Sequence, residues 1–387
     1  MLKILAIKNY RSILDLKVNL SRLNLITGPN GSGKSNLYRA LRLLADTAEG
    51  GVITSLAAEG GLESTFWAGP EFLSNAMKLG QVEIQGGRRQ HRKLLQLGFA
   101  SDNYSYAISL GLTANQYSAF GLDPEIKREY IWKGDCYRPS NNLVDRKANV
   151  VKIRLKRKWE IFSQDINTFD SLFDQFANTS LAPEIFDTRE MIRSWRFYDH
   201  FRTDKDSPIR RPQLGTRTPV LHHDGHDLAA ALQTIIEIGD HVALDEAIKD
   251  AFGDVKLKVT KQDNGLFSLA FHQKGLLRPL TAAELSDGTL RYILWIAALL
   301  TPRPPSMMVL NEPETSIHNE LLPSLAKLIS NVTKHSQVLV ISHSNRLIKS
   351  LNEQSNCHAI ELEKELGSTQ IKGMGILDEP AWHWNNQ

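Results

Sequence analysis

Apolar and polar positions alternate along several stretches of the chain and recur elsewhere at helical spacing, so the sequence predicts both strands and helices. Residues 1–27 predict three strands, with a polar break at Asn9-Tyr10-Arg11-Ser12. The third strand is the apolar run Leu23–Thr27. Residues 36–44 then predict a helix, because apolar side chains recur at Leu37, Ala40, Leu41 and Leu44.

The following stretch predicts antiparallel sheet rather than repeated strand–helix–strand units. Residues 48–61 are rich in Gly and Ala, which indicates a flexible connection. The run Ser101-Asp102-Asn103 is typical of a hairpin turn between two strands. The strands predicted here are 81–85, 94–100, 104–112, 125–132 and the alternating apolar and basic segment 151–156.

The rest of the chain predicts a helical segment and then a second set of strands and helices. Amphipathic pieces within 165–190 and helices at 227–238 and 243–252 indicate a helical insertion. A hairpin around Asp263-Asn264-Gly265 follows, and the later elements are a helix at 290–300, a strand at 306–310, a helix at 321–329 and strands at 337–341 and 358–362. We predict an α/β fold with an N-terminal lobe (1–160), a helical insertion (161–252) and a C-terminal lobe (253–387).

Composition narrows the class of protein without identifying an activity. Hydrophobic residues make up 42% and charged residues 23% of the 387 positions, as in ordinary globular proteins. The formal charge is only +3, so any contact with nucleic acid must come from a local patch. Cys136 and Cys357 lie far apart, which favours a reducing compartment. The N-terminus lacks the apolar core of a signal peptide, and the longest apolar run, 293–300, is too short to span a bilayer; we therefore expect a cytoplasmic protein.

The most specific motif follows the third predicted strand and reads Gly28-Pro29-Asn30-Gly31-Ser32-Gly33-Lys34-Ser35. It fits G-x-x-x-x-G-K-[ST], the phosphate-binding loop of nucleoside triphosphatases. A strand, loop and helix in this order aim backbone N–H groups and a helix N-terminus at an anion. Lys34 would reach the β- and γ-phosphates, and the Ser35 hydroxyl would hold Mg²⁺. The predicted nucleotide-binding residues are Asn30, Gly31, Ser32, Gly33, Lys34, Ser35 and Asn36.

Three further motifs lie in the C-terminal lobe. Leu285-Ser286-Asp287-Gly288-Thr289 opens a helix with Ser286 as a natural N-cap, which offers backbone donors near Gly288 to an anion. The strand at 306–310 ends in Asn311-Glu312-Pro313-Glu314, the form of a Walker B element, which brings a metal-side group and a general base to the γ-phosphate. The strand at 337–341 leads into Ser342-His343-Ser344, and its order after Glu312 indicates a functional histidine.

Three charged clusters have less specific patterns. The basic clusters, Arg88 to Lys93 and Lys152 to Lys158, either contact a phosphate backbone or form solvated surface; the second would then be an edge strand whose lysines block aggregation. His222, His223 and His226 surround Asp224. We favour ordinary turn residues here over a metal site or an HNH-type nuclease, because the second acidic and His/Asn element of such a nuclease is not evident.

Taken in order, these motifs resemble the ABC-type ATPases of the RecF/SMC branch over nearly the whole chain. Arg291-Tyr292 after the signature, and the run from Glu312 to His318, are similar to the stand-alone AAA-type ATPases related to RecF and to the head of OLD proteins. The resemblance implies a P-loop fold with an ABC/SMC-type head, with ATP and Mg²⁺ as cofactors. It also implies a homodimer in which each ATP lies between the P-loop of one subunit and the signature of the other.

The resemblance also implies roles for particular residues. Glu312, with Lys34 and His343, would form the catalytic set, and His343 would be the switch histidine that senses the γ-phosphate. Arg11 matches the family's early arginine near the nucleotide. Residues that would reach the partner's nucleotide or cross the interface are Ser286, Gly288, Thr315, Ser316 and His318. For the Q-loop glutamine of the Mg²⁺ site, the alternatives are Gln81, Gln85 and Gln96.

Position 311 departs from the family's pattern, since most of the wider class has Asp where this chain has Asn311. An amide oxygen can accept a hydrogen bond from a Mg²⁺-bound water but brings no negative charge, so Mg²⁺ should be held less tightly by Ser35 and Asn311. Glu312 keeps the carboxylate that orients or deprotonates the attacking water. We therefore hypothesise slow hydrolysis and long-lived ATP-bound dimers.

Two functions stay open. In the first, ATP-dependent closure regulates a nucleic-acid transaction, such as DNA repair or defence against foreign DNA, through the basic clusters. In the alternative, the protein is a regulatory switch that clamps a separate effector, such as a toxin or nuclease, on the segment 161–252. A transporter ATPase is disfavoured because the signature departs from Leu-Ser-Gly-Gly-Gln, and the segment after His343 is too short for the Toprim domain that OLD proteins carry.

Overall fold

A computed structural model describes residues 1–70, 75–78, 81–83, 93–113, 118–176, 181–354 and 356–384. The chain forms two compact units. The first comprises Met1–Ser21, Gly28–Ser194 and Ile360–Gln387, and the second comprises Arg22–Thr27 and Trp195–Ala359. The three-part division at 160 and 252 stays a prediction. No helix among the described residues is both long and apolar enough to cross a bilayer.

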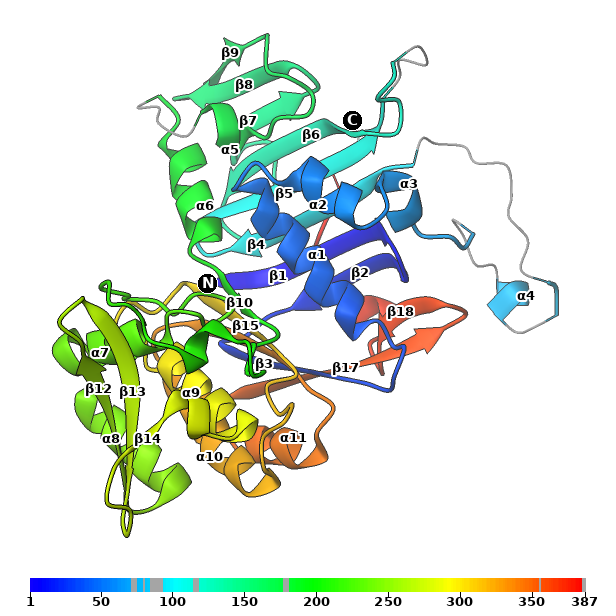
Figure 1. Cartoon of the computed structure of the whole chain (residues 1–387). Helices are drawn as coiled ribbons and strands as arrows, with labels where there is room; N and C mark the ends of the chain where they lie inside the picture. Colours follow the sequence, from blue (N-terminus) through cyan, green and yellow to red (C-terminus); the bar gives the residue numbers. More distant parts are fainter. Residues whose placement is uncertain are drawn as a thin grey trace. The chain divides into compact units, whose positions relative to one another are not determined.

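The first unit is built on an antiparallel sheet of eight strands in the order β2-β1-β4-β5-β6-β7-β8-β9 (Figure 1). Every neighbouring pair in this order is antiparallel. The strands are β1 (Leu2–Tyr10), β2 (Ile13–Asn19), β4 (Leu95–Ser101), β5 (Tyr104–Leu112), β6 (Pro124–Lys133), β7 (Asn142–Lys147), β8 (Val150–Leu155) and β9 (Lys158–Ser163). The predicted antiparallel subdomain is therefore confirmed, with β7 and β9 as additional strands.

Helices of the first unit include one that the sequence pattern did not predict. Its helices are α1 (Lys34–Thr47), α2 (Val52–Ala58), α3 (Leu62–Thr65), α4 (Asn75–Lys78), α5 (Leu172–Gln175) and α6 (Pro183–Arg193). The prediction of a flexible connection at 48–61 is wrong, because α2 buries Val52 and Leu56, four residues apart on one helical face. In the predicted strand 81–85, the described part, 81–83, is not a strand, and the remainder lies outside the described residues.

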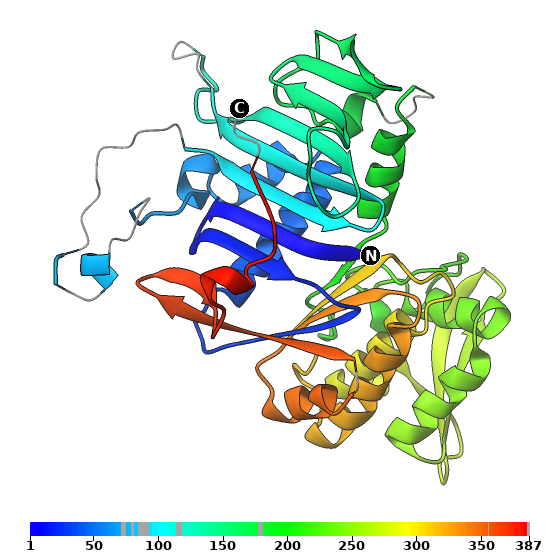
Figure 2. The same ribbon diagram turned by 180° about the vertical axis from the view of Figure 1, so that it is seen from behind.

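The C-terminal segment packs on the antiparallel sheet. Helix α1 covers one face of this sheet in Figure 1, and the tail crosses the opposite face in Figure 2. There the Trp382 ring packs edge-on against two other indoles. The distance between ring centroids is 5.5 Å to Trp132 and 5.1 Å to Trp384. A Cβ atom at Gly98 of β4 would lie 2.7 Å from the Trp382 ring, so glycine leaves the space that the indole fills. Trp382 is thus part of a small core with Ile4, Ala6 and Tyr130.

The second unit contains the parallel strands. Their order is β10-β15-β16-β3, and each neighbouring pair is parallel. The strands are β10 (Arg196–Tyr198), β15 (Met307–Asn311), β16 (Gln337–Ile341) and β3 (Leu23–Thr27). Strand β17 (Cys357–Glu365) begins in this unit and continues into the first, where it pairs antiparallel with β18 (Ser368–Ile371). A parallel set with an antiparallel addition confirms the predicted α/β class.

Helices and a small antiparallel sheet complete the second unit. The helices are α7 (Leu228–Ile238), α8 (His241–Phe252), α9 (Asp287–Leu299), α10 (Leu322–Val332) and α11 (Asn345–Asn352). The small sheet contains β11 (Gln213–Leu214), β12 (Val255–Lys261), β13 (Leu266–Gln273) and β14 (Leu280–Thr281). Short 3₁₀ turns are η1 (Pro208–Arg210), η2 (Ala282–Glu284), η3 (Asn319–Leu321) and, in the first unit, η4 (Ile376–Asp378). Segment 161–252, predicted as mostly helical, therefore also supplies β10 to the parallel sheet.

The core of the second unit fixes α9 against the parallel strands. Ten consecutive residues of α9, Leu290 to Leu299, are buried. Its Trp295 ring packs edge-on against Tyr198 of β10 and against Phe201, which follows that strand. The start of α9, which carries the signature motif, is therefore held firmly by the packing of the helix that it opens.

Candidate functional site

Three parallel strands of the second unit end at one edge of the sheet. Asn311, the last residue of β15, is in register with Ile341, the last residue of β16, and Ile341 is in register with Ile26 of β3. Polar segments follow each strand in the chain: residues 28–35 after β3, residues 312–316 after β15 and residues 342–344 after β16. In open α/β sheets, ligands bind outside the carboxyl ends of the strands. Each of these three strand ends thus leads directly along the chain into one of the predicted motifs.

The loop 28–35 has the backbone that a phosphate cradle requires. Gly28, Gly31 and Gly33 have φ of 144°, 79° and 106°, values that side-chain-bearing residues rarely adopt. A Cβ atom at Gly28 would lie 2.7 Å from Ser32 Oγ, and one at Gly33 would lie 2.1 Å from Thr369 Oγ1. Glycine at both positions therefore permits the close wrapping of the loop.

Polar groups of this loop are arranged for an anion. Helix α1 begins at Lys34 with Gly33 as its N-cap and no side-chain capping bond, which leaves the N–H groups of Lys34 and Ser35 for a ligand. Ser32 Oγ is buried with no hydrogen-bond partner. Lys34 Nζ donates to the carbonyl oxygens of Gly28 at 2.7 Å and Pro29 at 3.1 Å, and the Ser35 side chain is exposed. An orphaned hydroxyl, uncapped N–H groups and an ammonium group fit a polyphosphate.

Asn36 and Arg11 make contacts within the first unit. Asn36 Nδ2 donates to Ser12 Oγ at 2.7 Å, and this hydroxyl lies 2.7 Å from Thr369 Oγ1, so Asn36 ties α1 to the turn between β1 and β2. The Arg11 guanidinium donates to Glu59 Oε2 at 2.7 Å. Burial, then the hydrogen bond to Glu59, raises the pKa of the neighbouring Tyr10 phenol. The nucleotide contacts assigned to Arg11 and Asn36 stay predictions.

Glu312 has a strained backbone. Its φ is 48°, in the left-handed region, and its N–H donates to Ile341 O at 2.8 Å, which fixes the end of β15 to the end of β16. The Glu312 side chain is half-exposed, and its Oε1 lies 3.6 Å from His343 Nδ1. Strained residues cluster at functional sites because surrounding structure holds them there. The geometry brings together the two residues that the sequence predicted as base and switch histidine.

Glu314 is a buried residue to which the sequence assigned no role. Its Oε1 accepts hydrogen bonds from Ser342 Oγ at 2.8 Å, His343 N at 2.9 Å and Ser344 N at 3.0 Å, and it lies 3.5 Å from His343 Nδ1. One carboxylate oxygen therefore orders the whole turn that carries the histidine. The sequence feature that could have identified Glu314 is its place as the second acidic residue of Asn311-Glu312-Pro313-Glu314.

Asp199 is a second residue that the sequence did not single out. It follows β10 directly, and Asn311 Nδ2 donates to its Oδ1 at 2.7 Å. The contact arises from strand register, since Tyr198 of β10 pairs with Leu310 of β15. A carboxylate therefore stands beside the amide at the position where the motif resemblance implies Asp. The only signal in the sequence was an acid directly after two aromatic residues, Phe197 and Tyr198.

The three glutamines proposed for the Q-loop all belong to the first unit. Gln96 is buried in β4, where its Nε2 donates to Ser109 Oγ at 2.9 Å within the antiparallel sheet of the first unit. Gln81 lies in the short described segment 81–83, and Gln85 lies outside the described residues. Which of the three completes the Mg²⁺ site stays a prediction.

The signature and the segment after β15 touch each other in the second unit. Ser286 caps α9, because its Oγ accepts from Thr289 N at 3.1 Å. A Cβ atom at Gly288 would lie 2.8 Å from Ser316 O, so only glycine permits this approach. Arg291 Nη1 donates to Thr315 O at 3.0 Å and strengthens the same contact. Ser286, Thr315, Ser316 and His318 are all exposed.

The basic cluster from Lys152 to Lys158 lies on β8, β9 and the turn between them. Strand β9 lies at the edge and β8 does not, so the interpretation of 151–156 as an edge strand is wrong. Arg154 Nη1 donates to the carbonyl oxygens of Pro139 at 2.7 Å and Ser140 at 2.8 Å, which is a structural role. The side chains of Lys152, Lys156, Arg157 and Lys158 are exposed. In the other basic cluster, positions 88–92 lie outside the described residues.

Comparisons with known proteins agree with this geometry. A family model described as "AAA domain, putative AbiEii toxin, Type IV TA system" matches residues 23–349. No curated protein is similar in sequence. The chain is similar in structure to an Smc head bound to the C-terminal winged-helix domain of ScpA, with 13% identity, a TM-score of 0.51, and coverage of 97% of this chain and 98% of that chain.

Two further solved structures were found. The SMC head domain from Thermotoga maritima has 14% identity, a TM-score of 0.44 and coverage of 97% and 99% of the two chains. The Smc head with an extended coiled coil from Pyrococcus furiosus, bound to the C-terminal domain of ScpA, has 12% identity, a TM-score of 0.48 and coverage of 97% and 96%. At these identities the likeness concerns the fold alone, and the α/β arrangement resembles that of the SMC head.

Proposed function

Because the chain belongs to the P-loop ATPase family described as "AAA domain, putative AbiEii toxin, Type IV TA system", we propose that it binds and hydrolyses ATP with Mg²⁺. The resemblance drawn from its motifs is confirmed at the level of the family and the SMC-head fold. The observation that carries the proposal is the loop 28–35, whose three glycines have positive φ and whose lysine begins α1.

The phosphate chain of ATP binds the loop and the first turn of α1 in this proposal. Backbone N–H groups of Gly31, Gly33, Lys34 and Ser35 donate to phosphate oxygens, and the Ser32 hydroxyl gains the partner that it lacks within the protein. Lys34 Nζ leaves the carbonyl oxygens of Gly28 and Pro29 for the β- and γ-phosphates. The lysine exchanges neutral acceptors for charged ones, which makes stronger hydrogen bonds.

On the second unit, Mg²⁺ would be held by the pair Asn311 and Asp199, and the ligand role of the Ser35 hydroxyl stays a prediction. A bound Mg²⁺ neutralises charge on the phosphates. Asp199 supplies the negative charge that Asn311 lacks, and Asn311 fixes the orientation of that carboxylate through its hydrogen bond. Under this proposal Mg²⁺ would be held more tightly than by Asn311 alone, because the carboxylate of Asp199 directly follows the neighbouring strand β10.

Glu312 acts as the general base and His343 as the γ-phosphate sensor in the proposed reaction. The Glu312 carboxylate orients the attacking water and accepts its proton, and His343 donates a hydrogen bond to the γ-phosphate. Glu314 is a positioning residue, because its three hydrogen bonds hold the turn of His343. In this proposal, hydrolysis depends on how the ends of β15 and β16 are held together. The backbone bond from Glu312 N–H to Ile341 O and the buried carboxylate of Glu314 hold them.

We place the dimer contact on the exposed face formed by Ser286, Gly288 and Ser316. These residues belong to one cluster, since the Gly288 backbone lies against the Ser316 carbonyl. In the closed homodimer, the N-terminus of α9 would donate to the γ-phosphate bound by the other subunit. ATP then acts as the link between two copies, and its hydrolysis separates them.

Replacing Lys34 with Met tests nucleotide binding. We expect ATP affinity to fall about 10- to 100-fold, because charge-assisted hydrogen bonds contribute about 1.5–3 kcal/mol. Isothermal titration of the purified full chain with ATP and Mg²⁺ measures the change. Arg39→Met, which removes an exposed cation from the same helix, is the matched control and should bind like the parent. Equal affinity of the Lys34→Met variant and the parent would contradict the proposal.

The biological role that we favour is an ATP-gated step in defence against foreign DNA or in DNA repair. The family description supports defence, because it includes a toxin–antitoxin system. The exposed side chains of Lys152, Lys156 and Lys158, beside the exposed ring of Trp159, support a nucleic-acid contact. The alternative is a switch that clamps a separate effector protein without binding DNA.

A salt titration separates these two roles. We expect the affinity of the parent protein for duplex DNA to fall steeply with salt, and each contacting lysine that is removed to lower the logarithmic slope by about 0.9. The test variant is Lys152→Gln/Lys156→Gln/Lys158→Gln, which spares Arg154. The control, Lys256→Gln/Lys258→Gln/Lys261→Gln, removes the same charge from exposed positions of β12. Equal slopes for both variants would favour the effector-clamping role.

A further inference from the structure

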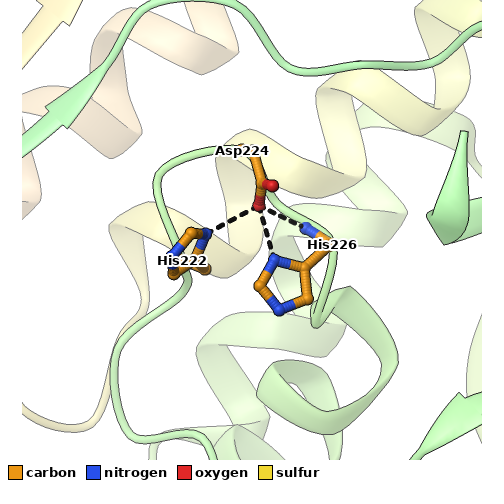
Figure 3. Close-up of side chains that lie close together, drawn as sticks. All are labelled: His222, Asp224 and His226. Atoms are coloured by element: carbon orange, nitrogen blue, oxygen red, sulfur yellow. Dashed lines mark hydrogen bonds and ion pairs between the residues drawn. The ribbon is translucent and has the colours of Figure 1, made fainter.

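The loop before α7 brings two histidines and an aspartate together. His222 Nδ1 lies 2.7 Å from Asp224 Oδ1, and His226 Nδ1 lies 2.6 Å from the same oxygen. Figure 3 shows both imidazole rings turned toward this carboxylate. The three ligand-type atoms lie within 4.8 Å of one another. The spacing H-x-D-x-H on one short loop therefore produces a converging set of two nitrogens and one oxygen.

Buried anchors fix this loop on the second unit. Leu221 is buried, and its carbonyl oxygen accepts a hydrogen bond from Tyr198 OH at 3.0 Å. Gly225 has φ of 76°, and a Cβ atom there would lie 2.4 Å from Leu294 of α9, so the turn rests directly on the core. Leu228, the first residue of α7, is also buried. The ligand-type residues alternate with these anchors and are held in place by them.

Hydrogen bonds inside the loop add to its rigidity. His222 N–H donates to Asp227 Oδ1 at 3.1 Å, and Gly225 N–H donates to His222 O at 3.0 Å. His226 N–H donates to Asp224 Oδ1 at 3.0 Å, so this single oxygen faces three nitrogen atoms. Both imidazoles place their Nδ1 atom beside this one oxygen. A tight turn does not require these two side-chain contacts. The bond from His226 N–H to Asp224 Oδ1 is an ordinary Asx turn, but the two imidazole contacts to the same oxygen are not part of that turn.

We propose that His222, Asp224 and His226 form a zinc site, separate from the nucleotide loop. Two imidazole nitrogens and one carboxylate oxygen suit Zn²⁺ and similar transition metals, whereas Mg²⁺ and Ca²⁺ prefer oxygen ligands. Zinc lies about 2.0–2.2 Å from such ligands, which places tetrahedral ligand atoms roughly 3.4 Å apart. Each imidazole therefore needs to move by less than about 1 Å from its position beside the carboxylate.

The site is open to solvent on one side. The side chains of His222, Asp224 and His226 are 45%, 44% and 46% exposed. Three protein ligands with one open position are typical of zinc that binds water or an added ligand, whereas structural zinc sites have four protein ligands. The remaining position would be taken by water or by a side chain of a partner. This inference does not depend on ATP binding at residues 28–35.

Zinc titration of the full chain, with any purification tag removed and after metal removal, tests the site. We expect one Zn²⁺ per chain, and a visible absorption band of tetrahedral geometry when Co²⁺ replaces it. His222→Ala and His226→Ala should each weaken Zn²⁺ binding by at least about 100-fold, since changes even behind a metal ligand cost 10–100-fold. Asp224→Asn keeps a hydrogen-bond acceptor for the loop but should also weaken binding, which separates lost coordination from lost folding.

His223→Ala is the matched control, because it removes a histidine from the same loop that lies outside the converging set. It should change Zn²⁺ affinity by less than about twofold, and circular dichroism should show that all four variants are folded. Excess Mg²⁺ should leave bound Zn²⁺ in place. The proposal is overturned if the parent binds no Zn²⁺ more tightly than the His222→Ala/His226→Ala variant, or if His223→Ala weakens binding as much as the ligand substitutions do.

Discussion

Replacing Glu312 with Gln is expected to leave ATP binding intact and to reduce turnover by about 100- to 10,000-fold, the contribution typical of a positioned general base. The amide has nearly the shape of the carboxylate but cannot take a proton from water. The same change should trap the ATP-bound homodimer. Steady-state phosphate release, ATP titration and size-exclusion chromatography with and without ATP measure the three effects.

Two features of the structure support this expectation. The backbone N–H of Glu312 bonds to Ile341 O at 2.8 Å, and glutamine leaves that bond unchanged. The side chain is 46% exposed, so its substitution should cost little folding stability. A loss of activity would therefore reflect the chemistry of the carboxylate rather than the loss of the fold.

Glu320→Gln is the matched control for this substitution, because its side chain is 79% exposed and lies on η3, shortly after Glu312 in the chain. It should hydrolyse ATP at the parental rate. If the Glu312→Gln variant also retained the parental rate, another residue would have to supply the base. His343 and Glu314 would be the next candidates, since both lie close to Glu312 in the second unit.

Replacing Asp199 with Asn is expected to lower Mg²⁺-dependent turnover roughly 100-fold at low Mg²⁺ and to raise the Mg²⁺ concentration needed for half-maximal activity. Asp199 is the carboxylate beside Asn311, at 2.7 Å from its amide nitrogen. Its removal leaves two amides and no charge at the two strand ends. Charge-assisted contacts are about twice as strong as neutral ones, so weaker Mg²⁺ binding follows. A Mg²⁺ titration of the ATPase rate measures the change.

Exchanging the two residues provides a sharper test. The variant Asp199→Asn/Asn311→Asp again has one carboxylate and one amide side by side, with the charge moved to the last residue of β15. We expect it to recover most of the Mg²⁺ affinity lost in Asp199→Asn. Asp206→Asn, which neutralises an acid that is 86% exposed, is the control and should behave like the parent. If the exchanged variant were no better than Asp199→Asn, the pair would have only a structural role.

The hydrophobic pattern predicted most of the parallel sheet. Strands β3 and β16 match the predicted runs, since fully buried strands read as short apolar runs bounded by polar residues. Strand β7 was missed because its second half consists of the charged residues Asp145, Arg146 and Lys147. This arginine is fully buried and pairs with Glu129 at 2.6 Å, and no pattern of apolar residues reveals a charge that another charge neutralises in the core. The helix α2 was missed because glycines surround its short apolar repeat.

The sequence predicted those residues of the candidate site that belong to motifs along one continuous stretch of chain. Residues 28–35, Glu312 and His343 were found because each motif reads along a single stretch of chain. Asp199 was missed because it meets Asn311 only through the pairing of β10 with β15, across more than a hundred residues. A three-residue strand has too few positions to show a period. The functions of the predicted site residues remain to be measured by the substitutions described above.

Because the backbone of Glu312 is in the left-handed region, selection for thermal stability and selection for ATPase activity favour different residues at this position. A residue with a Cβ atom in this conformation costs roughly 1–2 kcal/mol, which glycine would avoid. A library selected only for survival at high temperature would therefore enrich glycine or asparagine at this codon and discard the carboxylate. Any stabilised version intended for use should keep this position out of the randomised set.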